Sequence, residues 1–364
     1  MTDHGRVVRA SATAPVRVAD VGGWTDTWFG SPGQVCHLAV GPGVVVEASF
    51  ADAVAGPGLG PVRIVAPMLF EDYRCGPSPE RGWQWPVPGR QPLLEQAVAS
   101  VLEEVDLPAG RSVDLVVRSA VPAGASLGTS GSVVVAVLGA LDSLFGRVRT
   151  STEVARAAHA VETERVRRES GVQDQWAAAF GGCGLLAVGP YPDVRRESVE
   201  LSAGTVAELG ARLVTVVFGP HDSSAVHAQV INDMVGCSGP EHEAARAALR
   251  QLAALAPDAA DALRTGDVDR WARVLTEATD TQRALHVELV GRAHAAAIDV
   301  ARAHGAAGWK VNGAGGDGGS LTVVAGDGRS AAGLRDALGR VDPSWQVVDL
   351  APAPGLDVVT TLRP

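Results

Sequence analysis

The sequence predicts a two-domain globular protein that mixes sheets with helices. At 364 residues the chain is longer than one ordinary compact core, and two packed domains account for its length. The opening third contains short Val-rich stretches separated by Gly and Pro, which is typical of strands in a sheet. The later half contains long Ala-rich stretches with helical spacing. We place the boundary near residue 205, so the predicted domains span residues 1–205 and 206–364.

Composition and charge exclude several classes of protein. With 46% hydrophobic and 20% charged residues, the chain is typical of soluble globular proteins, and no apolar run approaches the ~20 residues of a membrane helix. The opening residues lack the apolar stretch of a secretory signal, so we expect a cytoplasmic protein with no membrane partner. The formal net charge of −10 argues against nucleic acid as a partner, because such binding depends on clustered Lys and Arg.

The cationic residues limit the ways in which the chain can hold a nucleotide. Of the 31 Lys and Arg residues, only Lys310 is a lysine. A Walker A phosphate loop needs a lysine directly after its glycine turn, and the sequence contains no Gly-Lys-Ser or Gly-Lys-Thr. Any nucleotide phosphates must therefore be bound in another way.

A strand, a glycine-containing loop and a buried helix are predicted in succession across residues 112–146. The loop, VPAGASLGTSGS at residues 121–132, has small residues that let backbone N–H groups approach an anion, and the helix directs its positive end there. Thr129 and Ser130 add hydroxyl groups that can bind phosphate oxygens or Mg²⁺. An ordinary glycine turn with serine caps explains the same residues, so both interpretations stay open.

Three further segments carry charged side chains suited to catalysis. In GVQDQWAAAFGG, the Asp174 carboxylate can take a proton from a hydroxyl group. In APVRVADVGGWTDT, Arg17 lies on a predicted strand, where it can steady a developing phosphoryl charge, and Asp26 lies in the turn that follows. Glu162 lies beside the apolar stripe of the predicted helix ARAAHAVETERV. Turn or cap roles for the aspartates and a surface ion pair for Arg17 are the plain alternatives.

The segment GAGGDGG at residues 313–319 contains the spacing G-x-G-x-x-G. This spacing does not predict a dinucleotide fold here, because the residues that follow, SLTVVAG, predict a strand rather than a helix. The glycines therefore join two strands. A hairpin loop with positive φ angles and a loop that admits a ligand or a neighbouring backbone both fit this pattern.

Taken together and in order, APVRVADVGGWTDT, VPAGASLGTSGS, GVQDQWAAAFGG and GWKVNGAGGDGG resemble the motifs of the galactokinase, homoserine kinase, mevalonate kinase and phosphomevalonate kinase (GHMP) superfamily. GGWTDT and VPAGASLGTS are similar to L-fucose kinases, and QDQWAAAFGG is similar to D-glycero-D-manno-heptose 7-phosphate kinases. The resemblance implies an α+β fold with a ribosomal protein S5 domain 2-like N-terminal domain and a ferredoxin-like C-terminal domain. It also implies a kinase that binds ATP between the domains and phosphorylates the anomeric hydroxyl group of a sugar.

The resemblance assigns a role to particular residues of these segments. Asp174 becomes the general base and Arg17 its charge partner, while Ser130 and Glu162 become ligands of Mg²⁺. The residues expected to hold ATP are Pro122, Gly124, Ser126, Leu127, Gly128, Thr129 and Ser130. The residues expected to bind the sugar or sugar phosphate are Gly23, Trp24, Asp26, Gly313, Gly315 and Gly316.

The sequence also departs from the family pattern and leaves alternatives open. Ser126 stands where the family usually has Gly, and Asp317 interrupts the family's glycine run. One alternative is a sugar-binding or nucleotide-binding protein that has this fold without turnover, and another is a kinase for a non-sugar alcohol such as mevalonate or homoserine. The identity of the sugar, whether it already carries a phosphate, and the oligomeric state, with a homodimer as one alternative, stay open.

Overall fold

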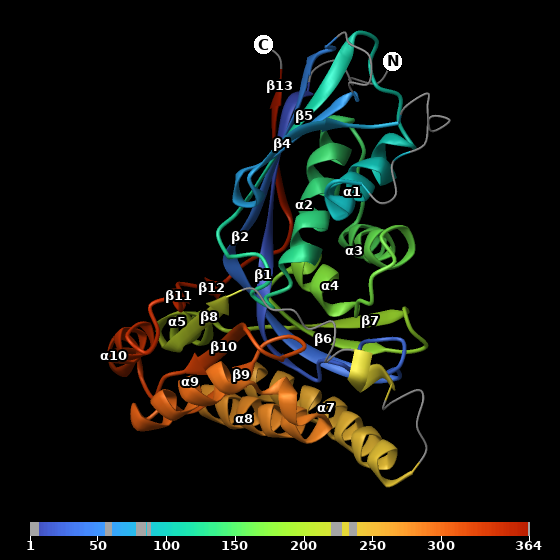
Figure 1. Cartoon of the computed structure of the whole chain (residues 1–364). Coiled ribbons are helices and arrows are strands. Elements are labelled where there is room, and N and C mark those ends of the chain that lie inside the picture. Colours follow the sequence, from blue (N-terminus) through green and yellow to red (C-terminus); the bar gives the residue numbers. More distant parts are fainter. Residues whose placement is uncertain are drawn as a thin grey trace.

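The computed structural model divides the chain into two sheets, each covered by helices (Figure 1). The upper part of the molecule in Figure 1 contains most of the larger sheet, and the lower part contains the smaller sheet and the longest helices. The described residues are 7–54, 60–77, 85, 89–219, 228–232 and 239–362.

Among the described residues, the larger sheet has the strand order β13-β1-β2-β5-β3-β4, while β6 and β12 pair with β2, and β7 pairs with β6. Strands β3 and β5 pair in parallel, and the other pairs are antiparallel. The long strands β1 and β2 extend from the upper part of the molecule into the lower part (Figure 1). The strands are β1 (Val7–Val21), β2 (Gly33–Asp52), β3 (Val62–Ala66), β4 (Glu71–Cys75), β5 (Arg111–Ser119), β6 (Cys183–Val188), β7 (Val194–Val199), β12 (Ala351–Pro352) and β13 (Asp357–Leu362).

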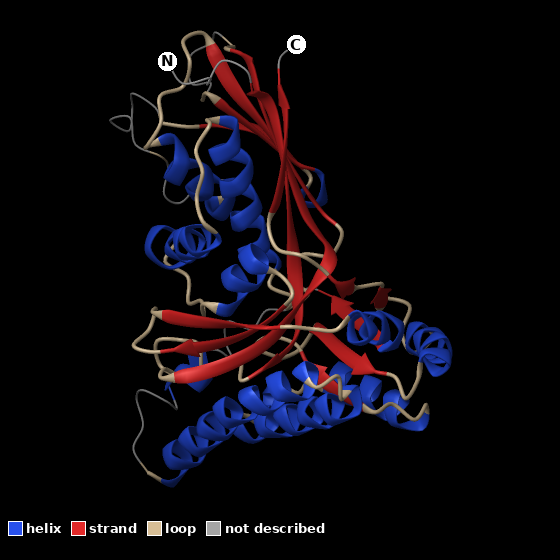
Figure 2. Cartoon of the chain, turned by 180° about the vertical axis from the view of Figure 1, so that it is seen from behind, coloured by secondary structure: helices blue, strands red, loops and turns tan. Residues whose placement is uncertain are grey.

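Helices cover one face of the upper sheet (Figure 2). In β2, Val44, Val46 and Ala48 are fully buried and the residues between them are partly exposed, as expected for a strand with one face on the core. The predicted apolar helix of this part is confirmed, because most residues of α2 are buried. The helices of this part are η1 (Pro67–Leu69), α1 (Pro92–Leu102), α2 (Thr129–Leu144), α3 (Ser151–Ala160), the π-helical η3 (Val161–Arg165) and α4 (Gln173–Phe180).

The smaller sheet has the order β11-β8-β10-β9, and its strands pair antiparallel. Helices α7, α8 and α9 lie along the lower side of the molecule in Figure 1, and α5 and α10 lie at one end. The strands are β8 (Leu213–Gly219), β9 (Gly308–Val311), β10 (Gly319–Val324) and β11 (Gln346–Val348). The helices are α5 (Ala203–Arg212), α7 (Pro240–Arg264), α8 (Val268–Leu285), η4 (Val287–Leu289), α9 (Arg292–Ala303) and α10 (Gly328–Gly339).

The glycine segment and the domain boundary predicted from the sequence can be located in the structure. The glycine segment 313–319 joins the antiparallel strands β9 and β10, so it does not open a helix. Residue 205 lies inside α5, and β12 and β13 return from the end of the chain to the larger sheet. The division of the chain at 205 stays a prediction.

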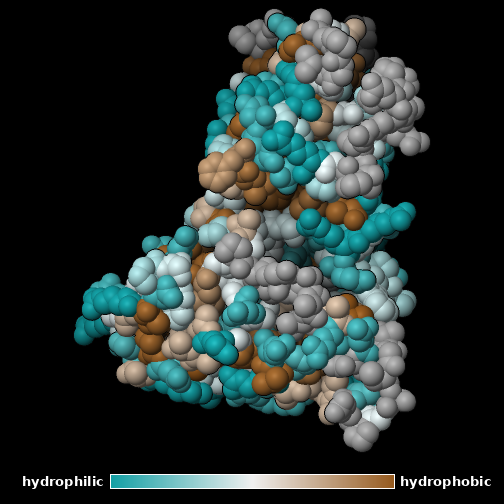
Figure 3. Space-filling view, in the orientation of Figure 1, coloured by the Kyte–Doolittle hydropathy of each residue, from teal (hydrophilic) through white to brown (hydrophobic). Residues whose placement is uncertain are grey.

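The surface is mainly hydrophilic on the face shown in Figure 3. Apolar surface forms small patches there, with a prominent one at the waist between the upper and lower parts. Among the described residues, no helix has the length and apolar character needed to cross a membrane.

Candidate active site

A cleft of about 810 Å³ lies where β1, the start of α2 and the start of α4 meet the loop between β9 and β10. Its lining combines residues from the turn that follows β1 with residues from the glycine segment between β9 and β10. The predicted site residues that line it are Arg17, Trp24, Asp26, Ser130, Glu162, Asp174 and Gly313.

The loop before α2 has a backbone that only small residues adopt easily. Gly124, Ser126 and Gly128 have φ angles of 75°, 56° and 72°, which favour glycine. Gly128 is the N-cap of α2, and no side chain caps this helix, so its first N–H groups are suited to an anion. The Leu127 side chain is in the core and its carbonyl accepts the Arg17 N–H at 2.9 Å, so only its backbone can serve a ligand. The other predicted residues of this loop, all half-buried, are Pro122, Thr129 and Ser130.

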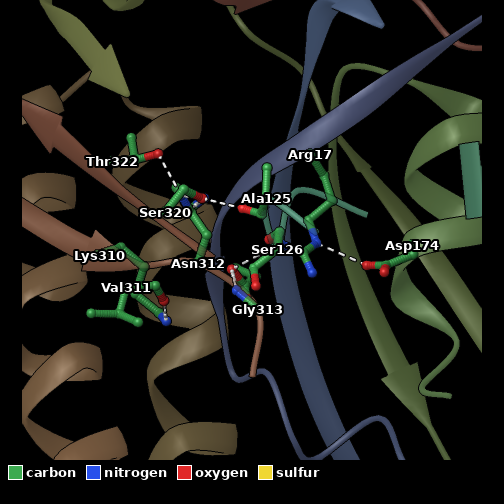
Figure 4. Close-up of polar contacts among 12 residues, drawn as sticks. Arg17, Ala125, Ser126, Asp174, Lys310, Val311, Asn312, Gly313, Ser320 and Thr322 are labelled. Carbon is green, nitrogen blue, oxygen red and sulfur yellow. Dashed lines mark hydrogen bonds and ion pairs between the residues drawn. The ribbon is translucent and has the colours of Figure 1, made fainter. Parts of the chain in front are cut away.

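Arg17 and Asp174 form an ion pair at the wall of the cleft. The Arg17 Nε donates to Asp174 Oδ1 at 2.8 Å, and Nη1 donates to the Ser126 carbonyl at 2.6 Å (Figure 4). Burial by itself would lower the pKa of Arg17, but the carboxylates of Asp174 and Asp20 outweigh it and raise that pKa. The Arg17 side chain is 5% exposed and the Asp174 side chain is 23% exposed, so the carboxylate is the more accessible member of the pair.

Glu162 lies in the π-helical turn η3 and lines the cleft. Its Oε2 accepts hydrogen bonds from Ser170 Oγ at 2.8 Å and from Gln175 Nε2 at 3.0 Å. Burial raises the pKa of Glu162, while hydrogen bonds from Ser170 and Ser130 act in the opposite direction. Among the described residues, Oε1 is buried without a partner. An unpartnered carboxylate oxygen in a cleft that Ser130 also lines suits a hard cation.

The described residues contain no group of three His, Cys, Asp or Glu side chains that could hold a metal ion. This fits Mg²⁺ bound together with phosphates, because Mg²⁺ usually takes one or two carboxylates and completes its shell with water and phosphate oxygens. The role of Glu162 and Ser130 as its ligands stays a prediction. One carboxylate and one hydroxyl group fit a metal ion that phosphates also bind better than a metal ion held by the protein alone.

Asp26 and Trp24 form another part of the cleft wall. Asp26 is 2% exposed, and its Oδ2 accepts the main-chain N–H of Gln173 at 3.0 Å. Burial raises the pKa of Asp26 to about 6, against the effect of that hydrogen bond. Trp24 is buried, with its ring centroid 6.1 Å from that of Phe29. Gly23 does not line the cleft, and a Cβ there would lie 2.7 Å from Asp20 Oδ2.

The three predicted glycines of the β9–β10 loop lie in different places. Gly313 lines the cleft, and a Cβ there would be 3.1 Å from both Arg17 Nη2 and the Ser126 carbonyl oxygen. Gly315 and Gly316 instead pack on Leu289, because a Cβ at Gly315 would lie 2.1 Å from the Leu289 oxygen and the Gly316 N–H donates to it at 3.1 Å. Neither of them lines the cleft, so their contact with substrate stays a prediction.

Some residues of the site were not predicted from the sequence. Arg168, Glu169 and Ser170 line the cleft, and the charged run directly before the QDQ segment is the only signal for them. Asp20 and Asn312 lie behind Arg17, fully buried. Both belong to segments that resemble kinase motifs, but their partners are distant in the sequence.

Comparison with known proteins identifies the fold of this site. Residues 92–182, from the start of α1 to just after α4, match the family described as GHMP kinases N terminal domain. This chain carries a GHMP kinase N-terminal domain. Over 96% of its length the chain also superposes on 98% of a D-glycero-D-manno-heptose 1-phosphate kinase from Bacteroides thetaiotaomicron, with a TM-score of 0.71 and 21% identity. The predicted α+β GHMP kinase fold is therefore confirmed.

Two curated relatives of this GHMP domain are similar over shorter stretches. A mevalonate kinase from Thermococcus sibiricus is 38% identical over 89 residues, which are 24% of this chain and 26% of the relative. An L-fucokinase/L-fucose-1-P guanylyltransferase from Bacteroides fragilis is 28% identical over 192 residues, which are 48% of this chain and 20% of the relative. The chain thus spans about a quarter of the length of the mevalonate kinases that it matches.

Proposed function

We propose that this chain is an ATP-dependent sugar kinase that transfers the γ-phosphate of ATP to a sugar hydroxyl group. The acceptor is proposed to be the anomeric hydroxyl of a heptose 7-phosphate or of a fucose-like sugar. The observation that carries the proposal is the Arg17–Asp174 ion pair, which lies at the wall of the same cleft as the uncapped start of α2. A reachable carboxylate beside an anion site is the arrangement that phosphoryl transfer to a hydroxyl group needs.

The phosphates of ATP are assigned to the loop at Gly124–Ser130, where helix N–H groups and small residues let them approach closely. A bound Mg²⁺ ion would neutralise part of their charge, and Glu162 with Ser130 would hold it. The hydroxyl oxygen of the acceptor sugar forms a bond to the γ-phosphorus of ATP. The bond between that phosphorus and the β–γ bridging oxygen breaks, and ADP leaves. The hydroxyl proton passes to the Asp174 carboxylate.

Arg17 has two tasks in this scheme. Its bond to Asp174 Oδ1 fixes the base in place, and its positive charge favours the ionised carboxylate. Because a Cβ at Gly313 would almost touch Arg17 Nη2, the guanidinium also borders the space next to the glycine loop, where charge develops on the transferred group. Most of the catalytic effect is expected to come from such positioning and charge stabilisation.

The wall formed by Asp26 and Trp24 supports a sugar as the acceptor. A buried carboxylate can accept hydrogen bonds from sugar hydroxyl groups, and an aromatic ring can cover the apolar face of the sugar. The similarity to proteins named as a fucokinase and as a heptose 1-phosphate kinase points the same way. The similarity to mevalonate kinases favours a second candidate, a kinase for a non-sugar alcohol.

An acceptor panel tests these proposals. Purified protein with ATP and Mg²⁺ should consume ATP in the presence of L-fucose or a heptose 7-phosphate, and ³¹P NMR should show a new sugar 1-phosphate. Consumption with mevalonate or homoserine alone would support the second candidate. If the protein binds ATP or sugar but transfers no phosphate to any acceptor, the chain is a binding protein with this fold. The Arg17→Met variant controls for contaminating kinases.

Glu162→Gln is expected to raise the Mg²⁺ concentration needed for half-maximal rate by at least about tenfold. Loss of a group that only supports a metal ligand already costs about tenfold or more in metal affinity, and loss of the ligand's charge should cost no less. The substitution removes the charge of the proposed ligand and keeps its shape, so the sugar KM should change much less. Titration of the initial rate with Mg²⁺ at saturating ATP measures the effect. Glu164→Gln is the matched control, because Glu164 is exposed two residues farther along the same turn. Equal Mg²⁺ dependence of both variants would remove Glu162 from the metal site.

A further inference from the structure

Three segments that are far apart in the sequence meet directly behind Arg17 (Figure 4). They are the end of β1, the phosphate loop before α2, and the residues from Asn312 to Ser320 that include the glycine segment. Each segment supplies part of the cleft, namely Arg17, the start of α2 and Gly313. The relative placement of these three parts therefore sets the geometry of the site.

The first and third segments exchange a reciprocal pair of hydrogen bonds. The Ala19 N–H donates to Asn312 Oδ1 at 2.9 Å, and the Gly313 N–H donates to Asp20 Oδ1 at 2.9 Å. Ala19 has a φ angle of 55°, and the pairing of β1 with β2 shifts register between Val18 and Val21. Because this bulge takes Ala19 out of the ladder, its buried N–H needs another acceptor, and Asn312 is that acceptor.

The Asn312 amide is also linked to the phosphate loop through the Ser320 hydroxyl group. Its Nδ2 donates to Ser320 Oγ at 3.0 Å and to Thr322 Oγ1 at 2.9 Å. The Ser320 hydroxyl in turn donates to the Ala125 carbonyl at 2.6 Å. All of these side chains have 0% exposure, so water does not replace the bonds. Asn312 thus uses its acceptor and both donors at once, which neither aspartate nor leucine can do at this size.

Asp20 adds a charge to this arrangement. It is fully buried, and its Oδ1 lies 3.5 Å from Arg17 Nη1. Burial would raise the pKa of Asp20, but Arg17, Lys310 and the Gly313 N–H outweigh it and keep that pKa below its usual value. The Lys310 ammonium is itself held by Gln282 Oε1 at 2.7 Å. Asp20 therefore stays an anion on the far side of Arg17, and the guanidinium is held between Asp20 and Asp174.

We propose that Asn312 and Asp20 are positioning residues that fix Arg17, the phosphate loop and the Gly313 backbone relative to one another for phosphoryl transfer. We call this pair the Asn312–Asp20 clasp. The inference rests on the proposed kinase function for its effect on rate, but the clasp itself is a property of the fold. Asn312 and Asp20 do not line the cleft, so the clasp acts through the residues that it holds.

Hydrogen–deuterium exchange tests the clasp without any assay of activity. In Asn312→Ala, the N–H groups of residues 19–20, 122–130 and 313–319 should exchange about tenfold faster, because the loss of a buried hydrogen bond shifts a local opening equilibrium by about that factor. Thr215→Val is the matched control. Thr215 is buried in β8 of the smaller sheet and bonds Thr322 Oγ1 at 3.0 Å, but among the described residues it forms no side-chain hydrogen bond to the three segments. Unchanged exchange in Asn312→Ala, or equal changes in both variants, overturns the clasp.

The rate of phosphoryl transfer tests the positioning role. At a temperature where both variants are folded, Asn312→Ala should lower the single-turnover rate about a hundredfold, as misplacement of reacting groups by about 1 Å can do, while ATP affinity changes less than about threefold. Thr215→Val should keep the wild-type rate. If the segments loosen but the rate is unchanged, the positioning role is wrong. If wild-type protein transfers no phosphate while the exchange result holds, the kinase proposal fails and the clasp stands.

Two milder variants cover the case in which Asn312→Ala does not fold. Ser320→Ala removes the bond to the Ala125 carbonyl and one of the two bonds that Asn312 Nδ2 donates. Asp20→Asn keeps an acceptor for the Gly313 N–H while removing the charge beside Arg17. Ser320→Ala should speed exchange mainly in residues 122–130, because Asn312 keeps its bonds to the Ala19 N–H and to Thr322 Oγ1. Asp20→Asn should lower the transfer rate at least about tenfold with little change in exchange at Gly313, since the acceptor remains. Wild-type behaviour of both variants overturns the proposal.

Discussion

Asp174→Asn should lower the single-turnover rate of phosphoryl transfer by about a hundredfold or more, since a general base typically contributes about 10²–10⁴. The amide keeps the shape of the carboxylate and can still accept the Arg17 Nε–H at Oδ1. It cannot take up a proton, however. Binding of ATP and sugar, measured by calorimetry in the absence of turnover, should therefore stay close to that of the wild type.

Arg17→Met separates the base from its charge partner. Met fills much of the space of the Arg stem, but it removes the bonds to Asp174 and to the Ser126 carbonyl. This variant should lose rate as well, and it should also weaken the order of the phosphate loop. Near-normal turnover in Asp174→Asn combined with a collapse in Arg17→Met would make Asp174 a substrate contact only, with catalysis carried by positioning and charge.

Gly128→Leu should abolish measurable ATP binding while the protein stays folded. Gly128 has a φ angle of 72°, and a Cβ there would lie 3.0 Å from Asp174 Cγ and 3.3 Å from Arg17 Cγ. A leucine side chain would therefore enter the space where helix α2 begins and displace the ion pair. Fluorescent-nucleotide titration measures the binding, and circular dichroism checks the fold.

Gly110→Leu is the matched control for the backbone strain of this substitution. Gly110 has a nearly equal φ angle of 71°, but a Cβ there would meet nothing within 4 Å. It should lose a similar amount of stability and keep its affinity for ATP. Wild-type affinity in Gly128→Leu would exclude the loop as the nucleotide site, and equal loss in both variants would mean that strain rather than the site is responsible.

Much of the fold and of the site could be predicted from local patterns in the sequence. The apolar run after the glycine loop indicated a buried helix, and α2 is buried along most of its length. Thr150 and Glu153, three residues apart, form a capping box at the start of α3, and this spacing can be read in the sequence. The spacing of strand-like residues around the glycine segment indicated a turn between strands, and β9 and β10 pair antiparallel around it. These features depend on neighbours in the sequence, so the sequence reveals them.

Other parts of the site depend on contacts that no local pattern contains. Arg17 and Asp174 are 157 residues apart, and they meet because a glycine at 131 lets α2 approach the start of α4 closely. Glu162 lines the cleft from a π-helical turn, and the helix predicted over these residues did not foresee that turn. Gly315 and Gly316 face Leu289 rather than the cleft, although the glycine run looks uniform in the sequence.

The sequence by itself determined many of the elements, the family resemblance and four of the charged residues that meet in the cleft, namely Arg17, Asp26, Glu162 and Asp174. Only the tertiary structure decided which of them touch, and it alone disclosed the Asn312–Asp20 clasp. The physical reason is the kind of partner involved. Asn312 and Asp20 each accept a main-chain N–H from a segment 293 residues away, and a main-chain donor leaves no mark in the sequence. A main-chain N–H group needs an acceptor from the protein only after folding has buried it away from water.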